Sequence, residues 1–327
     1  MAVAVATYLR RTKQVIVERI VYGAFEAREL QGDRTCAPVF DLTALLDLVD
    51  WTEGAEAFLD RGDAAALAQK LSKTHERLWR ERAERTGEEL PRRIYHLANR
   101  LNSFAQAIRL ARPRDAMRSA NELRSILMEA VSEVERWALP FAVILQGIRA
   151  EVEKLALPDP DRLDAENLRR QLRLIEYALE KGMVASAILM AREWVVNWTI
   201  LQRGEGDWVQ REFREEVEEA LGAAVRESQS QAQSEGVPEW FRRLPRSEDA
   251  AKLWSGLSEL RNDVAHCGFR PRPLPLEGIE KRARDLLEGL ASLLETDDLE
   301  AMRVLHGGRV VLDLSRLYEG GTAKLDD

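Results

Sequence analysis

The sequence predicts a mainly α-helical protein that begins with a small, partial α/β segment. From about residue 63 onward, apolar residues recur at three- and four-residue spacing, which is typical of amphipathic helices. Before that point the apolar runs are short and are separated by turn signals, which is typical of strands and short helices. A chain of 327 residues can bury a proper core and is long enough for about two domains.

The composition excludes several classes of protein. Hydrophobic residues make up 45% of the chain and charged residues 32%, which indicates a globular rather than a disordered protein. The net charge of −8 excludes binding of nucleic acid through a global basic field, so any site for a polyanion must be local. Cys36 and Cys267 lie far apart and give neither a disulfide framework nor a zinc-ligand spacing, which predicts a cytoplasmic protein without a metal. No apolar run approaches the ~18 residues of a membrane span.

Residues 1–65 predict a fragment of α/β alternation. The opening "MAVAVATYLRR" reads as an amphipathic helix. The apolar run 20–22 ends at Gly23 and predicts a buried strand that turns into a loop. Pro38 precedes a short strand, and Asp41 or Thr43 is a candidate N-cap for the next helix.

The strand at 20–22 has too few predicted neighbours. A strand that is apolar on both faces belongs inside a sheet, and one or two strands do not form a stable sheet. We therefore expect that the opening strands of this N-terminal domain are missing from the chain, through truncation or a misplaced start.

The sequence after residue 65 predicts a series of helices, and one clear linker divides this series. "LPDPDRLDA" at 157–165 carries two prolines and a candidate N-cap, Asp164. We expect three regions, which are 1–65, a helical connecting region at 66–157, and a C-terminal helical domain at 158–327. Helical patterns occupy 64–87, 92–111, 114–140, 166–182, 183–201, 248–267 and 274–295, a polar stretch covers 226–236, and "MRVLHGGRVVLDLS" predicts a hairpin turned by Gly307 and Gly308.

The stretch "RNDVAHCGFR", residues 261–270, is the candidate site. In the predicted helix 248–267, Asn262 and His266 are four residues apart and so share a face. Arg261 lies about 140° round the helix from His266, and its long side chain can reach back. Gly268 and Pro271 end the helix and leave the imidazole at an exposed position. The predicted buried stripe consists of Leu253, Trp254, Leu257, Leu260 and Val264.

A second interpretation of this stretch stays open. A helix C-terminus favours a cationic residue because the helix dipole is negative there.

The other three histidines have no comparable neighbours. His75 and His96 fall in amphipathic helices and His306 in a turn, so we expect structural roles for them.

Several segments resemble one protein family, in the order expected for it. "RNDVAHCG" resembles the R-x4-H signature of HEPN ribonucleases. "LMAREWVVNW" at 189–198 resembles the partner helix of that domain in CRISPR-associated proteins that join a CARF sensor to a HEPN nuclease. "ERIVYGAFEAR" and "PVFDLTALLDLVDWTEGAEAFLDRGD" resemble the middle of the CARF domain, which is Rossmann-like. The opening strand of that domain and its ligand-contacting turn have no counterpart here.

The resemblance implies an accessory effector of type III CRISPR antiviral defence, activated by cyclic oligoadenylate and forming a homodimer. Its reaction would be metal-independent cleavage of single-stranded RNA, because the 2′-hydroxyl of RNA supplies the nucleophile and no cofactor is needed. His266 would act as general base or acid. Arg261 would hold the scissile phosphate, and Asn262 would orient the imidazole or bind phosphate. Arg192 and Glu193 are candidate supporting residues, and Glu193 is equally well explained as a solvated helix charge.

The candidate ligand-binding residues are Tyr22, Gly23, Ala24 and Phe25. They end the predicted strand, where an α/β sheet binds its ligands. Gly23 would permit close approach of the backbone, and an aromatic ring can stack on adenine. The alternative is a buried tyrosine and phenylalanine beside a glycine turn.

Two other functions remain open. One is a catalytically silent CARF–HEPN regulator or dimerisation protein, against which the intact Arg261, Asn262 and His266 argue. The other is a HEPN toxin held by an antitoxin, which would share the site but not the CARF-like segment.

Overall fold

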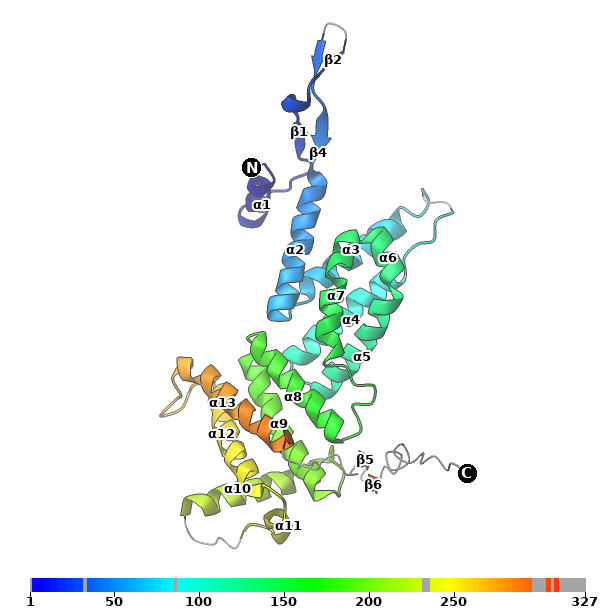
Figure 1. The fold of residues 1–327 in the computed structure, drawn as a ribbon. Coiled ribbons are helices and arrows are strands. Elements are labelled where there is room, and N and C mark those ends of the chain that lie inside the picture. Colours follow the sequence, from blue (N-terminus) through cyan, green and yellow to red (C-terminus); the bar gives the residue numbers. More distant parts are fainter. Residues whose placement is uncertain are drawn as a thin grey trace, which may run out of the picture. The chain divides into compact units, whose positions relative to one another are not determined.

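The computed structural model describes residues 2–31, 34–84, 87–230, 236–295, 304–306 and 309–311. These residues are mainly helical, which confirms the predicted fold class (Figure 1). They form two compact units. Unit 1 contains residues up to Asn99 together with Glu129–Gly147, and unit 2 contains Arg100–Met128 and the chain from Ile148 onward.

Unit 1 begins with the predicted helix and two short ladders of strands. The helix is α1 (Ala2–Thr12). Strand β1 (Val21–Gly23) pairs antiparallel with β4 (Val39–Asp41), and β2 (Glu29–Gln31) pairs antiparallel with β3 (Arg34–Cys36). One 3₁₀ turn, η1 (Phe25–Ala27), lies between β1 and β2. The predicted helix and the strands β1 and β4 are present, whereas β2 and β3 fall in the stretch predicted as a loop. Both ladders are antiparallel, whereas a Rossmann-like sheet pairs its strands in parallel.

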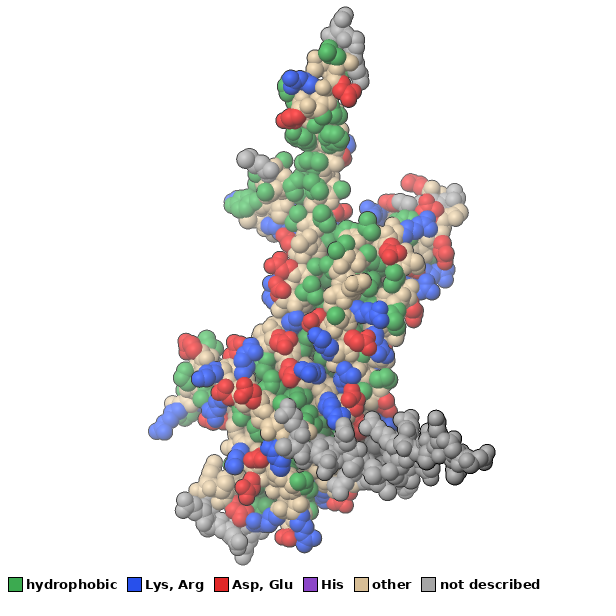
Figure 2. Space-filling view, in the orientation of Figure 1, with side chains coloured by type: hydrophobic (Ala, Val, Ile, Leu, Met, Phe, Trp, Pro, Cys, Tyr) green, Lys and Arg blue, Asp and Glu red, His purple; other side chains and the backbone are tan. Residues whose placement is uncertain are grey.

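The prediction that β1 is buried is wrong. Val21 is 60% exposed and Tyr22 45%, and only the flanking Ile20 and Ala24 are buried. Figure 2 shows hydrophobic side chains gathered at the surface over β1, β4 and the start of the next helix. The reason is that β1 pairs with one strand, and no second layer among the described residues covers it.

The rest of unit 1 is helical. Helix α2 is preceded by Leu42 at its N-cap position, and the Asp41 carboxylate accepts a hydrogen bond from the Thr43 backbone N–H at 2.9 Å. The prediction of Asp41 or Thr43 as the N-cap is therefore wrong, because Leu42 occupies that position and its side chain makes no capping hydrogen bond; the Thr43 hydroxyl instead accepts from the Ile20 N–H at 3.0 Å. The helices contributing to this unit are α2 (Thr43–Arg61), α3 (Ala65–Arg80), the start of α4 (Arg93–Arg109), α6 (Val131–Trp137) and most of α7 (Leu139–Glu153).

The single helical pattern predicted at 114–140 forms more than one helix. The chain makes α5 (Pro113–Glu129), then α6, and then starts α7. Pro140 explains the break at Ala138, because a proline has no N–H for the preceding turn and its ring collides with the carbonyl four residues earlier.

Unit 2 is built around one apolar helix, α9. Its neighbours in the packing are α8, α10, α12 and α13. Asp164 caps α8 as predicted, since its side chain accepts from the Asn167 N–H at 2.8 Å. The helices of this unit after the linker are α8 (Ala165–Glu180), α9 (Val184–Arg203), α10 (Arg211–Ser230), α11 (Glu239–Arg242), α12 (Ser247–Ala265) and α13 (Leu276–Glu295).

Helix α9 has the length and apolar composition of a membrane span. Of its most apolar window, 72% is buried inside the structure, as in the core helix of a folded domain. Trp194 and Trp198 are fully buried along it.

Part of the predicted polar stretch at 226–236 is helical, because α10 runs to Ser230, and residues 231–235 lie outside the described residues.

The predicted C-terminal hairpin is present. Strand β5 (Val304–His306) pairs antiparallel with β6 (Arg309–Val311), so that His306 is opposite Arg309. The predicted turn residues Gly307 and Gly308 lie outside the described residues.

Candidate functional site

The last turns of α12 carry the predicted catalytic residues on a helix whose apolar side is in the core. Leu253, Trp254, Leu257 and Leu260 are buried, as predicted. Val264 is only half-buried. The end of the helix is therefore held from one side and open on the other.

Arg261, Asn262 and His266 lie within the last two turns of α12 and at its C-cap. The Arg261 guanidinium donates from Nη1 to the side-chain oxygen of the adjacent Asn262 at 2.9 Å. The His266 backbone N–H donates to the Asn262 carbonyl at 3.0 Å and closes the last helical turn. The imidazole is exposed and has no hydrogen-bond partner among the described residues. It can therefore give or take a proton from a ligand.

The turn after His266 has an unusual backbone. Cys267 and Gly268 both have positive φ angles, +53° and +73°. Glycine adopts this conformation freely, whereas a residue with a Cβ, such as Cys267, pays about 1–2 kcal/mol. The Gly268 N–H donates to the Asp263 carbonyl at 2.9 Å, and the Phe269 N–H to the His266 carbonyl at 2.8 Å. The chain thus turns sharply immediately beyond the imidazole.

Asp263 holds this turn from inside and was missed by the sequence analysis. Its side chain is 3% exposed. Its Oδ1 accepts from the Leu274 N–H at 3.2 Å and from Arg270 Nη1 at 3.4 Å. Arg270 also donates to the Glu259 carbonyl at 3.3 Å. The available signal was position, because Asp263 follows Leu260 by three residues and so lies beside the buried stripe.

Arg192 and Glu193 lie on α9 in an ion-pair cluster. The Arg192 guanidinium lies 4.1 Å from the Trp254 ring centroid and pairs with Glu218 of α10 at 2.6 Å and with Glu193 at 2.9 Å. Glu193 also accepts from Arg214 of α10. Arg192 is nearly buried, with 11% of its side chain exposed. This cluster connects three helices of unit 2.

The structure does not bring this cluster into contact with the end of α12. Trp254 precedes Arg261 by seven residues, which is about 10 Å along a helix. Among the described residues, no hydrogen bond or ion pair joins Arg192 or Glu193 to Arg261, Asn262 or His266. Any effect of Arg192 on the candidate site must pass through the position of α12.

The predicted ligand-binding residues lie at the exposed end of β1. The Tyr22 hydroxyl donates to Glu26 at 2.9 Å, and this hydrogen bond raises the pKa of Tyr22. Phe25 is 63% exposed, and the Arg28 guanidinium lies 4.2 Å from its ring centroid. A side chain at Gly23 would meet open space. The alternative of a buried tyrosine and phenylalanine is therefore wrong, while Ala24 is buried.

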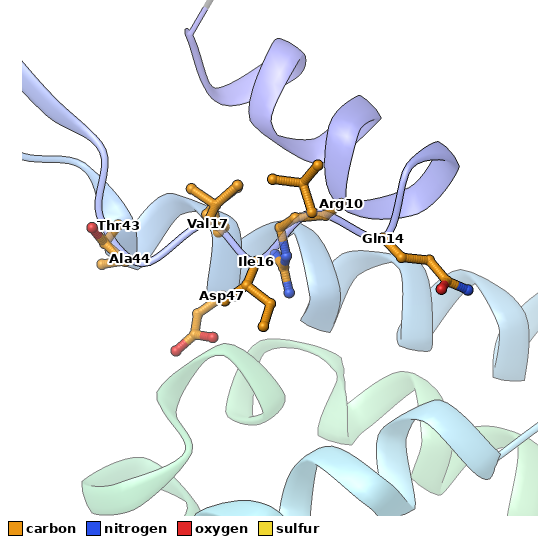
Figure 3. Close-up of a pocket in the computed structure, with 9 residues that line it drawn as sticks. Arg10, Gln14, Ile16, Val17, Thr43, Ala44 and Asp47 are labelled. Atoms are coloured by element: carbon orange, nitrogen blue, oxygen red, sulfur yellow. The ribbon is translucent and has the colours of Figure 1, made fainter.

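A pocket of about 540 Å³ lies elsewhere in unit 1, and the sequence analysis did not predict it (Figure 3). The segment between α1 and β1 contributes Gln14, Ile16 and Val17, and the first turns of α2 contribute Thr43 and Asp47. The predicted residues 22–25 do not line it.

A larger pocket, of about 780 Å³, lies in unit 2 between α10, α11, α12 and α13. Lys252, Ser255 and Gly256 line it from α12. At about 100° per residue, Ser255 points to the same side of α12 as Asn262 and His266.

The comparisons with known proteins connect part of the chain with CRISPR-associated proteins. Residues 47–157 match the family model described as CRISPR-associated protein MJ1674, second domain. This range runs from α2 to the linker before α8 and excludes the end of α12. The chain matches no curated protein.

Proposed function

We propose that this protein is a metal-independent endoribonuclease for single-stranded RNA, which acts in type III CRISPR antiviral defence and is regulated by cyclic oligoadenylate. The observation that carries the proposal is the end of α12, where an exposed imidazole stands one turn from an asparagine that accepts a hydrogen bond from an arginine. The similarity of residues 47–157 to a CRISPR-associated domain supports the biological setting.

The chemistry needs only the groups at this site and the RNA itself. The 2′-hydroxyl attacks the neighbouring phosphorus, so that the O2′–P bond forms and the P–O5′ bond breaks. His266 accepts the proton of the 2′-hydroxyl or donates one to the leaving 5′ oxygen. Arg261 neutralises the charge that develops on the non-bridging oxygens. The products are a 2′,3′-cyclic phosphate and a 5′-hydroxyl.

Asn262 positions the arginine in this proposal. Its side-chain oxygen is used by Arg261, which leaves its amide NH₂ to donate to a phosphate oxygen. The Arg261–Asn262 pair then presents donors on the same side as His266. This pairing supports the proposal over a helix end that merely carries a cation.

A homodimer completes the proposed site. One imidazole cannot be deprotonated as a base and protonated as an acid at the same moment, so two copies of His266 in one cleft would divide the two roles. The exposure of His266 at the end of α12 leaves it open to a second chain. Cyclic oligoadenylate, bound through the segment that contains Tyr22 and Phe25, would change how the two copies meet.

The decisive test is His266→Ala in a cleavage assay with single-stranded RNA, in the presence of EDTA and with and without cyclic oligoadenylates. We expect a loss of about 10²–10⁴-fold, the usual contribution of a general acid or base. His96→Ala is the matched control, because His96 is an exposed histidine on another helix, α4. Cleavage that survives His266→Ala, or that EDTA abolishes in the parent chain, would overturn the proposal.

Arg261 offers a second arm of the same test. Arg261→Ala should reduce cleavage comparably, because the charge that develops on the scissile phosphate would lose the guanidinium proposed to neutralise it. Arg261→Lys should restore only part of the activity, since lysine keeps the charge but lacks the two-pronged geometry of the guanidinium. A parent chain that binds cyclic oligoadenylate but cleaves no RNA would instead indicate a silent regulator.

A further inference from the structure

The segment that follows His266 exposes an aromatic ring near an exposed arginine. Phe269 is 90% exposed. Arg272, three residues further on, is exposed and has no carboxylate partner among the described residues. Arg270 is paired with the buried Asp263, so the exposed Arg272 and His266 are the groups of this segment that a phosphate can reach. Arg272 is therefore a local cationic group of the kind that an acidic protein needs to bind a polyanion.

The exposed position of Phe269 is built into the fold. The Asp263 carboxylate fixes the loop at Arg270 and at the Leu274 N–H, and the Phe269 N–H is bonded to the His266 carbonyl. Pro271, Pro273 and Pro275 restrict the backbone further, because proline fixes φ. A ring presented on so constrained a loop loses little conformational entropy when it binds a ligand.

We propose that loop 267–275 is a nucleotide subsite, in which Phe269 stacks on a base beside the scissile phosphate and Arg272 contacts the next phosphate along the strand. This inference rests on the proposed ribonuclease function and adds to it a base-binding site. Three residues span at most about 10 Å, so Phe269 stands within a nucleotide or two of His266. Aromatic rings and cationic side chains in alternation are how proteins hold single-stranded nucleic acid.

Single-stranded RNA fits this loop better than a protein surface does. An apolar protein interface would be expected to contain a cluster of large hydrophobic side chains with few charges. Here Phe269 is flanked in the sequence by His266 and by Arg272, while Arg270 is paired with Asp263. In the subsite, Asp263 is a positioning residue, because it touches no RNA and acts by holding Arg270 and the loop.

The first experiment measures binding of a fluorescent single-stranded RNA in the His266→Ala background, where the probe stays intact, with cyclic oligoadenylate present. Phe269→Ala should weaken binding roughly 10-fold, as expected for the loss of one base–aromatic stack. Phe269→Trp should retain binding, whereas Phe269→Leu, which is apolar but has no ring, should not. Leu276→Ala is the control, because Leu276 is 80% exposed at the start of α13 and should not contribute.

The second experiment tests the phosphate contact. Arg272→Ala should reduce the slope of the logarithm of affinity against the logarithm of salt concentration by about 1, and Arg272→Lys should preserve that slope. Asp263→Asn should increase hydrogen exchange in residues 267–275 and raise KM more than it lowers kcat. Arg270→Leu removes the same tether from the exposed side and serves if Asp263→Asn does not fold.

Each failure has a distinct meaning. Binding and cleavage that Phe269→Ala leaves unchanged would overturn the subsite and spare the ribonuclease. Rescue by Phe269→Leu would overturn stacking. A change in sedimentation with Phe269→Ala, without a change in RNA affinity at equal oligomeric state, would show that the loop contacts a second chain instead. A parent chain that neither binds nor cleaves RNA would overturn both proposals.

Discussion

Helix α9 in unit 2 and strand β1 in unit 1 are both apolar segments, yet only the helix is buried. In α9, Trp194, Val195, Val196 and Trp198 have no exposed surface. In β1, all three residues are exposed. Helix α9 packs against four other helices, whereas β1 has one paired strand. An apolar run therefore becomes core only where other elements supply a surface on each side of it.

The largest effect expected from this comparison is at Trp198. Trp198→Ala should destabilise unit 2 by about 3–5 kcal/mol, because it leaves a large cavity in a tightly packed core. Hydrogen exchange of peptides from α8 and α9, followed in denaturant, would measure the loss for this unit separately from unit 1. A loss below about 1 kcal/mol would mean that α9 is not the core in solution.

The two buried tryptophans also provide a matched pair. The Trp194 indole N–H donates to the Leu168 carbonyl at 2.9 Å, whereas the Trp198 indole N–H has no partner among the described residues. Phenylalanine at either position removes similar volume. Trp194→Phe should therefore cost about 1 kcal/mol more than Trp198→Phe, since only the first substitution breaks a hydrogen bond.

The second largest effect on the stability of unit 2 is expected for a chain of buried amide side chains. Gln171 donates to the Asn167 side chain at 2.6 Å and accepts from Asn197 at 2.8 Å. Arg214 donates to Asn197 at 2.7 Å and also pairs with Glu193. Gln171→Leu would leave a buried acceptor on Asn167 and a buried donor on Asn197 unpaired, and we expect a loss of about 1–3 kcal/mol in the free energy of unfolding.

Thr199 is the control for the amide chain. Its hydroxyl is also buried on α9, but it donates only to the Val195 carbonyl within the same helix, at 2.8 Å. Thr199→Val keeps the shape and leaves that carbonyl with its helical partner. A cost for Thr199→Val as large as that for Gln171→Leu would show that the amide chain has no special part in unit 2.

Features that depend on neighbouring residues in the sequence were predictable. The helix-ending Gly268, the Asp164 cap and the buried stripe of α12 follow from spacing along one element. The exposure of β1 was not predictable, because the burial of this strand depends on elements far away in the sequence. The break before α7 had a local signal in Pro140, which the periodic pattern on either side concealed.

In the candidate site, too, the features set by spacing along one helix were predictable, and the features set by distant residues were not. Asn262 and His266 could be placed on one face from their spacing alone, and the reach of Arg261 to Asn262 follows from its length. It was not predictable that Asp263 anchors the 267–275 loop, because this contact depends on where the chain at Leu274 returns to the helix. The contact of Arg192 with Trp254 likewise requires the packing of α9 on α12.

The third prediction concerns the ion pairs that hold α1 and α3 to α2 in unit 1. Asp50 accepts hydrogen bonds from Arg10 at 3.2 Å and from Lys70 at 3.1 Å. Burial raises the pKa of the Asp50 carboxyl, but the hydrogen bonds and charges of Lys70 and Arg10 lower it by more, so that its pKa lies below the ordinary value. Asp50→Asn should destabilise unit 1 by about 0.5–1 kcal/mol, the range of partly exposed pairs.

The pH dependence has a definite sign. Because the pKa of Asp50 is lower in the folded state, its contribution is complete above the ordinary aspartate pKa of about 4 and is lost as the pH falls through the folded-state pKa. Stability curves of the parent chain and of Asp50→Asn should therefore converge below about pH 4. Asp47→Asn is the control, because Asp47 also pairs with Lys70 but is 65% exposed, and it should shift the curve little.

The smallest effect is expected in β1 itself. Tyr22→Ala should change the stability of unit 1 by no more than about 0.5 kcal/mol, because the ring is exposed and its hydroxyl bonds only to the exposed Glu26. Phe58→Ala in α2 is the comparison within the same unit and should cost about 3–5 kcal/mol, since Phe58 is fully buried. Hydrogen exchange of peptides from α2 and β1 measures both changes. A loss above about 1 kcal/mol for Tyr22→Ala would mean that the faces of β1 are covered in solution. If Tyr22→Ala lowers the stability of unit 1 only in the presence of cyclic oligoadenylate, the bound ligand is the surface that covers β1.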